Sequence, residues 1–258
     1  MGEELNNILL EFSSIGLADM EKVKLMNRVD VKYTFNIAQL NAVLHQLKEQ
    51  YSVVEISEKR ICQYNTLYYD TQHLNLYTKH QNGELNRYKI RHRTYVDSEL
   101  GFLEVKFKNN KGRTIKERIK EKEVPYQWQE KHFSFLNSEL TFDPAVLQPT
   151  IWVNYKRITL VNKNSPERVT IDIDLEFVHG DRQQGLSALV IAEVKQDKKQ
   201  KSPFIQLMKK MHIREGSISK YCMAICYSCE HVKKNNFKEQ LNNIKQIIYD
   251  DAFANSHR

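Results

Sequence analysis

Three segments of the chain alternate charged and apolar residues, which is the pattern of a β-strand with one polar and one apolar face. These segments span residues 88–95, 103–108 and 192–195. Residues i and i+2 of a strand point to the same side of a sheet, so the charges of each segment share one face. Several such strands in one chain favour a sheet that closes on itself with its ionic faces turned inward.

The wider pattern predicts an α+β fold in which strands dominate the middle of the chain. Period-two alternation and aromatic or β-branched residues predict strands at about 28–35, 51–56, 61–69, 86–95, 101–108, 112–121, 150–162, 167–177 and 187–195. Apolar residues at helical spacing predict helices at about 4–12, 37–50, 126–137, 203–211, 217–229 and 236–254, with a short one after Asp70. Roughly eight strands flanked by helices indicate an eight-stranded antiparallel β-barrel buttressed by helices. No Pro-, Gly- or Ser-rich linker interrupts residues 1–258, so we expect a single domain.

Many cations fall on the faces that would turn into this barrel. Burying unpaired charges is costly, so they favour a water-filled lumen that binds an anionic ligand. Arginine offers bidentate contacts to phosphate oxygens and lysine offers a compact charge. The inward-facing candidates are Lys32, Lys89, Arg91, Arg93, Lys106, Lys108, Lys116, Arg118, Arg157 and Lys195.

Carboxylates lie among these cations and could supply oxygen ligands for Mg²⁺ or Mn²⁺. They are Glu104, Asp172, Asp174 and Glu193. Fixed cations and a metal around a transferred group are what phosphoryl transfer requires. The alternative is a solvated sheet face with cross-strand ion pairs, and it stays open for Asp172 and Asp174.

Signatures of other chemistry are missing from the sequence. It contains no Gly-x-x-x-x-Gly-Lys-Ser/Thr loop, no Gly-x-Gly-x-x-Gly, no Gly-x-Ser-x-Gly and no His-Glu-x-x-His. His92 alternates with Arg91 and Arg93, so we expect it to pack on the opposite face. Cys222, Cys226 and Cys229 fit an apolar helix better than a zinc site.

Composition adds a preference for a polyanionic partner, because the net charge is +7 and the pI is near 9.0. The first residues do not resemble a signal peptide, and no apolar run is long enough to predict a transmembrane helix. We therefore expect a cytoplasmic protein with reduced thiols.

An ordered series of short motifs extends this interpretation. The motifs are Asp30-Val-Lys-Tyr33, Thr66-Leu-Tyr-Tyr-Asp70 followed by Leu76-Tyr77, Ile90-Arg-His-Arg93, Leu103-Glu-Val-Lys106, Lys116, Asn154-Tyr-Lys-Arg157, Ile171-Asp-Ile-Asp-Leu175, Ala192-Glu-Val-Lys195 and Ser217-Ile-Ser-Lys-Tyr221. Over about residues 26–225 the series resembles the catalytic domain of the VTC (vacuolar transporter chaperone) polyphosphate polymerases, in a stand-alone bacterial form. That family belongs to the triphosphate tunnel metalloenzymes, which are related to the CYTH phosphatases.

The resemblance implies a tunnel that binds a triphosphate and a divalent cation, Mn²⁺ or Mg²⁺. It assigns metal binding to Glu193, and alternation adds Glu104 as a second metal candidate. The substrate-binding candidates are Lys89, Tyr155, Lys195, Ser219 and Lys220. The catalytic candidates around the transferred phosphate are Lys32, Arg91, Arg93, Lys106, Lys116 and Arg157.

The function expected from the resemblance is an ATP-dependent polyphosphate polymerase that transfers the γ-phosphate of ATP to a growing chain. Two alternatives stay open: a triphosphate or nucleoside-triphosphate hydrolase in the same tunnel, and a non-catalytic module that binds polyphosphate, inositol phosphates or RNA. The expected partners are ATP and polyphosphate and not DNA, and the need for a protein partner is open. Lys220 is expected to lie apart from the strand-borne arginines and to contact the product chain.

Overall fold

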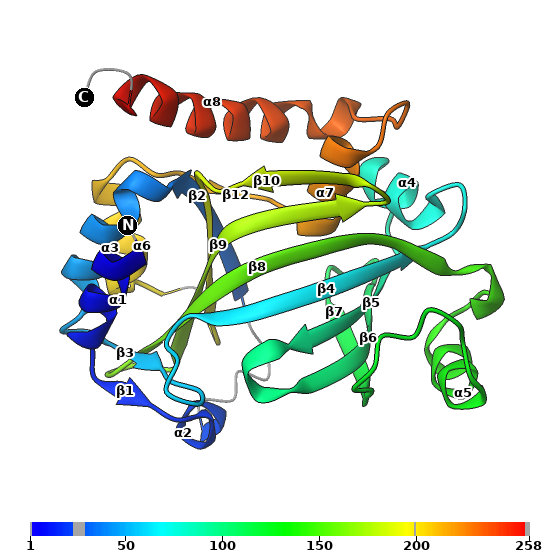
Figure 1. Cartoon of the computed structure of the whole chain (residues 1–258), viewed down its shortest axis with the longest axis horizontal. Helices are drawn as coiled ribbons and strands as arrows, with labels where there is room; N and C mark the ends of the chain where they lie inside the picture. The colour runs from blue at the N-terminus through cyan, green and yellow to red at the C-terminus, as the bar shows by residue number, and fades with distance from the viewer. Residues whose placement is uncertain (1, 23–28, 199, 256–258) are drawn as a thin grey trace.

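The computed structural model describes residues 2–22, 29–198 and 200–255. One large sheet dominates the fold, and the helices lie at its ends and along one side (Figure 1). The strands are β1 (Ser14–Ile15), β2 (Val29–Asn36), β3 (Tyr51–Val54), β4 (Cys62–Asp70), β5 (Arg87–Tyr95), β6 (Leu100–Lys108), β7 (Thr114–Lys120), β8 (Gln148–Asn162), β9 (Glu167–His179), β10 (Arg182–Leu186), β11 (Leu189–Gln196) and β12 (Glu215–Gly216). The α-helices are α1 (Gly2–Leu10), α2 (Leu17–Lys22), α3 (Leu40–Leu47), α4 (Asn75–Gln81), α5 (Glu130–Glu139), α6 (Pro203–Lys210), α7 (Lys220–Ser228) and α8 (Lys238–Asn255).

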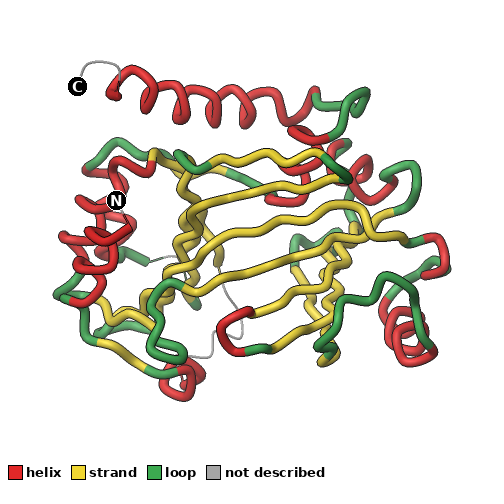
Figure 2. Tube along the Cα trace, in the orientation of Figure 1, coloured by secondary structure: helices red, strands yellow, loops and turns green. Residues whose placement is uncertain are grey.

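The strands form a single sheet, in which the long strands β9, β8 and β4 lie between two arms. One arm consists of β12, β2 and β11, and the other consists of β5, β6 and β7. Hydrogen-bonded neighbours follow the order β12-β2-β11-β9-β8-β4-β5-β6-β7, while β3 and β10 branch onto β8 and β9. The two-residue β1 pairs in parallel with β3, and the other pairs are antiparallel. The tube view shows the long central strands crossing between the arms (Figure 2).

The prediction of a closed eight-stranded barrel is not confirmed, since the sheet has 12 strands and remains open. Among the described residues, no strand pairing joins β7 to β12 or β2 at the two ends of the path. Residues 218–220 border the space between the arms. They form part of the wall that strands would form in a closed barrel. The α+β class and the predominantly antiparallel pairing are as predicted.

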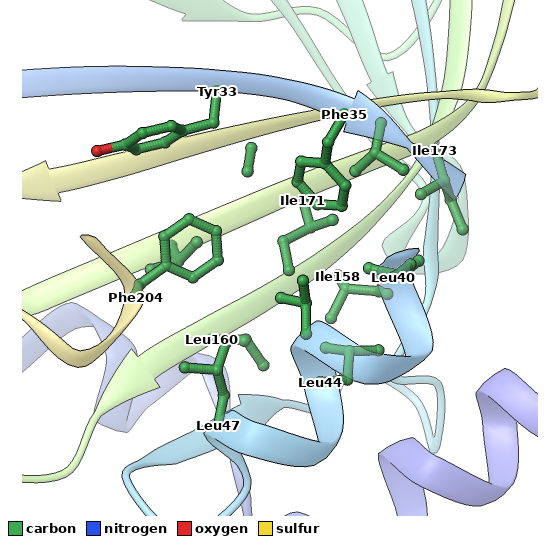
Figure 3. Packing of buried hydrophobic residues seen from close by; sticks show 14 of the residues in the cluster. Tyr33, Phe35, Leu40, Leu44, Leu47, Ile158, Leu160, Ile171, Ile173 and Phe204 are labelled. Carbon is green, nitrogen blue, oxygen red and sulfur yellow. The ribbon is translucent and has the colours of Figure 1, made fainter. Parts of the chain in front are cut away.

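Alternation on the long strands separates an apolar face from a charged one. On the apolar face, Ile158, Leu160 and Ile171 are buried against Leu44 of α3 and Phe204 of α6 (Figure 3). The residues between them in sequence point the other way, as period-two geometry requires. This core fixes the strands and thereby aims their charged residues into one space.

Most predicted elements are present with shifted ends. The helix expected over 217–229 begins at Lys220, where the Ser219 hydroxyl accepts a hydrogen bond from the backbone N–H of Cys222. Four elements were not predicted: β1, β10, β12 and α2. Two-residue strands such as β1 and β12 have no periodicity, and β10 is mostly polar. Arg28, at the start of one predicted strand, lies outside the described residues. None of the described helices has the length and apolarity needed to span a membrane.

Candidate functional site

A cavity of about 330 Å³ lies between the two arms of the sheet. Its wall is built from strands of both arms and from the start of α7, and we call it the cationic cavity. Eleven of the candidate residues border it: Lys32, Lys89, Arg91, Arg93, Lys106, Lys116, Arg157, Glu193, Lys195, Ser219 and Lys220. The other candidates do not line it, and they are Glu104, Lys108, Arg118, Tyr155, Asp172 and Asp174. Residues from distant parts of the sequence thus converge on one space, as the inward alternation predicted.

One wall of the cavity is a set of cross-strand rows on β5, β6 and β7. Register places Lys89, Lys106 and Lys116 side by side in one row. Lys89 also reaches α7, since its Nζ donates to the Ser219 hydroxyl at 3.0 Å. Arg91, together with burial, holds the pKa of Lys106 well below its usual range. An anionic ligand beside this row would favour the protonated, charged form of these lysines.

Glu104 lies in the next row, beneath the cavity wall, where it forms ion pairs with cations of the wall. Its side chain is fully buried; it accepts a hydrogen bond from Arg91 Nε at 2.7 Å and forms an ion pair with Lys116. Burial alone would raise the pKa of Glu104, but Arg91 and Arg93 outweigh it and hold the pKa far below the ordinary value. Both carboxylate oxygens are therefore engaged by protein cations, which does not favour Glu104 as a metal ligand.

Two other residues predicted to face inward lie outside the cavity wall. Arg118 is exposed and stacks over Phe102, with its guanidinium carbon 4.3 Å from the ring centroid. Lys108 is exposed beyond the cavity, one step along β6 from Lys106. Alternation places both on the predicted face but does not say where along that face the cavity ends.

A buried carboxylate on β9 joins two cations at the centre of the site. Asp172 receives two hydrogen bonds from Arg157, from Nε at 2.6 Å and from Nη2 at 2.8 Å, and also pairs with Lys220. Burial alone would raise the pKa of Asp172, but Arg157 and Lys220 hold it well below the usual range. Lys220 therefore lies beside a strand-borne arginine, which corrects the expectation that it stands apart.

Asp174, two residues further along β9, faces elsewhere. Its side chain is 47% exposed and pairs with Lys156 at 2.9 Å. The register between β8 and β9 shifts here, and Asp174 has a φ of +50°, which marks an irregularity in the ladder. Simple alternation fails across such a bulge, so Asp172 and Asp174 do not share one environment.

Tyr155 lies beneath the cavity and does not line it. Its ring stacks on Tyr64 with centroids 5.3 Å apart, and it is only 1% exposed. Lys220 Nζ lies 4.8 Å and the Arg157 guanidinium carbon 5.2 Å from the centroid of its ring. Tyr155 thus supports two cations through its π face. Its hydroxyl is buried and has no hydrogen-bond partner among the described residues.

Glu193 is the predicted metal ligand that does border the cavity. It pairs with Lys195 at 2.6 Å and with Lys32 at 3.6 Å, and its side chain is 20% exposed. Burial would raise its pKa, but these two lysines hold the pKa well below the ordinary range. The carboxylate therefore stays ionised and accessible from the cavity, as a cation ligand must.

The donor set suits a divalent cation that a substrate helps to hold. Asp30 and Glu193 are the carboxylates on the cavity wall. Mg²⁺ in nucleotide sites is bound by one or two carboxylates together with phosphate oxygens. Across the described ranges, no three His, Cys, Asp or Glu side chains converge as a metal site. The residues therefore fit a phosphate-bound cation better than a cage built from protein alone, and the cysteines of α7 form no such cluster.

Sequence reasoning missed the tyrosines of β4. Tyr68 borders the cavity, accepts a hydrogen bond from Arg91 at 3.2 Å and stacks on Tyr221. Burial would raise the pKa of Tyr68, but Arg91 and Arg93 lower it below the usual value. Tyr221 in turn donates to the buried Asp70, which ties α7 to β4. The available signal was the alternation of Tyr64, Thr66 and Tyr68, which places all three on one face.

We expect the affinity for tripolyphosphate to fall as the pH rises through about 8. Burial lowers the pKa of Lys116 to about 8, opposed by Glu104 and reinforced by Arg91, and burial likewise lowers the pKa of Lys195 to about 8. Only the protonated amines attract phosphate, so both attractions are present below this pH and are lost above it. Calorimetric titration across this range measures the effect.

Lys116→Arg is the matched control, because arginine stays charged throughout the range. Its affinity should decline less steeply with pH than that of the wild-type protein. Any titration of the ligand itself is common to both proteins and cancels in the comparison. Identical pH profiles would contradict the role of Lys116.

Comparison with known proteins places this geometry in a family. The family profile described as VTC domain matches residues 27–229. No curated protein sequence matches the chain significantly. Similar solved structures include a proposed adenylate cyclase from Bacillus halodurans, with 12% identity, a TM-score of 0.44 and coverage of 80% of this chain and 100% of that one. Another is a proposed adenylyl cyclase from Hippeastrum, described as having a dominant triphosphatase activity, with 14% identity, a TM-score of 0.43 and coverage of 80% and 98%.

Proposed function

Because the chain belongs to the VTC domain family, we propose that it is an ATP-dependent polyphosphate polymerase. The observation that carries the proposal is the convergence of cations from both arms of the sheet on one cavity. Among the described residues, the carboxylates on its wall are only Asp30 and Glu193. Such a surplus of fixed positive charge suits several adjacent phosphate groups. Family membership alone would not establish an activity, so the proposal rests on the site.

The reaction we propose is a direct transfer. An oxygen of the chain's terminal phosphate attacks the γ-phosphorus of ATP, the bond from that phosphorus to the β,γ-bridging oxygen breaks, and ADP leaves. We assign to Arg91, Arg93 and Arg157, which border the cavity, the neutralisation of the transferred phosphoryl group and the alignment of the attacking and leaving oxygens. A divalent cation bound with the triphosphate would add charge neutralisation, and Asp30 and Glu193 would hold it.

The cations differ in how firmly the protein positions them. Arg91 and Arg157 are held by the buried carboxylates Glu104 and Asp172. Arg93 has no ion pair among the described residues; its guanidinium carbon lies 5.7 Å from the centroid of the Tyr64 ring, and its Nε donates to Thr66. Arg93 therefore has the largest share of its hydrogen-bonding capacity free for a ligand.

The deciding experiment incubates the purified chain with ATP and either Mn²⁺ or Mg²⁺, and follows ADP release together with the size of any polymer on a gel. Polymer formation coupled to ADP release supports the proposal. Release of one orthophosphate per ADP without polymer would assign a hydrolase instead. Binding without turnover would assign a polyanion-binding module.

Arg93→Ala tests the cavity within the same assay. Losing hydrogen bonds to a charged group costs roughly 1.5–3 kcal/mol, which corresponds to about a 10- to 150-fold weaker affinity for tripolyphosphate. Stability should change little, since no buried carboxylate is left without its partner. Wild-type affinity in this variant would show that the ligand does not occupy the cationic cavity.

A further inference from the structure

The positive face of β5 and β6 continues past the cationic cavity. Arg87 and Lys108 face each other in the row next to Lys89 and Lys106. Residues two apart on a strand share a face and lie about 6.7 Å from one another. The extra row is therefore one such step beyond the wall of the cavity, in the direction of the β6–β7 turn.

The surroundings of His80 on α4 agree with this placement. Burial lowers the pKa of His80, and Lys89, Arg87 and Lys108 lower it further. His80 also contacts Cys222 of α7, with its Nδ1 3.0 Å from Sγ. Helix α4 packs against both β5, which carries Lys89 and Arg87, and α7.

The β6–β7 turn adds two more exposed cations, Lys111 and Arg113. Its shape is set by Asn109, whose side-chain oxygen accepts hydrogen bonds from the backbone N–H groups of both residues at 3.0 Å. Gly112 supplies the left-handed backbone conformation, with a φ of +76°. The backbone that carries these two cations therefore has a defined conformation.

None of these four cations takes part in an ion pair within the part of the chain that the structure describes. Arg87 donates to the backbone oxygen of Glu84 at 2.9 Å, while the Glu84 carboxylate accepts from Asn82. The other surroundings of the cavity differ in charge. On β2 and β11 the cavity wall combines Asp30 and Glu193 with Lys32 and Lys195, and the hollow beneath α8 combines Glu215 and Glu239 with Arg214.

We propose that Arg87, Lys108, Lys111 and Arg113, which we call the outer strip, bind the part of an extended inorganic polyphosphate chain that lies outside the cationic cavity. The proposal rests on the proposed function, because it takes the end of the chain to occupy the cavity. The strip gives the chain a direction, out past α4 and along the β6–β7 hairpin. Lys220, which sits inside the cavity beside Arg157, is not needed for this contact.

The chemistry of the strip favours polyphosphate over RNA. Sequence-tolerant RNA binding uses aromatic rings on which bases stack. Tyr88 and Phe107 alternate with the strip residues and stack on each other at 4.6 Å, on the opposite face of the sheet. A ligand that follows the strip is therefore held by charge, with no ring from either of these residues beneath it.

The test compares two double variants by titration with tripolyphosphate, with long-chain polyphosphate and with single-stranded RNA. Lys108→Ala/Lys111→Ala removes two charges from the strip, and Lys209→Ala/Lys210→Ala removes two exposed charges from α6, which lies beside α1 and α3 away from β6 and β7 (Figure 1). We expect the strip variant to bind long polyphosphate about tenfold more weakly, and tripolyphosphate as the wild type does. By analogy with single-stranded nucleic acids, the slope of log affinity against log salt should fall by about 0.7 per lost contact.

The other outcomes contradict the proposal, and they can be told apart. Unchanged long-chain affinity in the strip variant, or an equal loss in the α6 variant, removes the outer strip while leaving the proposed function standing. A larger loss for single-stranded RNA than for polyphosphate would make RNA the ligand of the strip. A wild-type protein that does not bind tripolyphosphate would refute the proposed function itself, and the strip with it.

Discussion

Asp172→Asn should lower the free energy of unfolding by roughly 3–5 kcal/mol, the usual effect of removing one partner from a buried ion pair. The Asp172 side chain is 3% exposed and is bound by both Arg157 and Lys220. The amide cannot neutralise these cations, so two largely buried positive charges lose their common counter-charge. Denaturant unfolding of the wild-type and variant proteins measures the loss.

Tripolyphosphate should restore part of this stability. Phosphate oxygens in the cavity can replace the missing negative charge beside Arg157 and Lys220, and a ligand that binds the folded state stabilises it in proportion to its occupancy. We therefore expect the ligand to raise the melting temperature of Asp172→Asn more than that of the wild type. An equal rise in both proteins would contradict the placement of phosphate at this pair.

Asp174→Asn is the matched control on the same strand. Its partner Lys156 is 50% exposed, and exposed pairs contribute about 0–1 kcal/mol. Asparagine also tolerates the left-handed backbone found at this position. Stability close to wild type in Asp174→Asn, beside a large loss in Asp172→Asn, would show that the effect comes from the buried charges.

Glu193→Gln should reduce metal-dependent turnover at least about 100-fold. A metal supplies several kcal/mol of charge stabilisation in such reactions, and each 1.36 kcal/mol is a factor of ten in rate. The same change releases Lys195 and Lys32 from their shared carboxylate. Binding of tripolyphosphate without metal should therefore be as tight as in the wild type or tighter, while turnover is lost.

This opposite response separates a metal ligand from a structural residue. If Glu193 only positioned the lysines, the variant would lose affinity and turnover together, at every metal concentration. Glu117→Gln serves as control, because Glu117 is exposed on β7 and pairs in register with Val105, whose side chain faces away from the cavity. Wild-type turnover of Glu193→Gln at limiting Mn²⁺ would refute the metal role.

Local alternation predicted the facing of many site residues correctly. Arg91 and Arg93 border the cavity, while His92 between them is fully buried on the other side, with its Nε2 2.8 Å from the backbone oxygen of Glu121. This succeeds because the facing of a strand residue depends only on its position in the pleat. The rule fails at Asp174, where the register between β8 and β9 shifts.

Alternation could not predict which carboxylates are used up in ion pairs with the protein's own cations. Glu104 and Glu193 both sit in a Glu-Val-Lys segment, and both were predicted to be metal ligands. In the folded chain Glu104 is sealed between Arg91 and Lys116, whereas Glu193 borders the cavity. Their difference comes from the neighbouring strands, which belong to separate parts of the sequence.

By itself, the sequence determined the longer alternating strands, their charged and apolar faces, and the cationic character of the space that these faces border, because all three depend on the spacing of neighbouring residues. Only the tertiary structure decided that the sheet remains open, that Lys220 of α7 shares Asp172 with Arg157, and that Tyr155 lies beneath the cavity. Those features depend on register and contacts between segments far apart in the chain. No local period encodes such contacts, since they are fixed by the packing of the whole core.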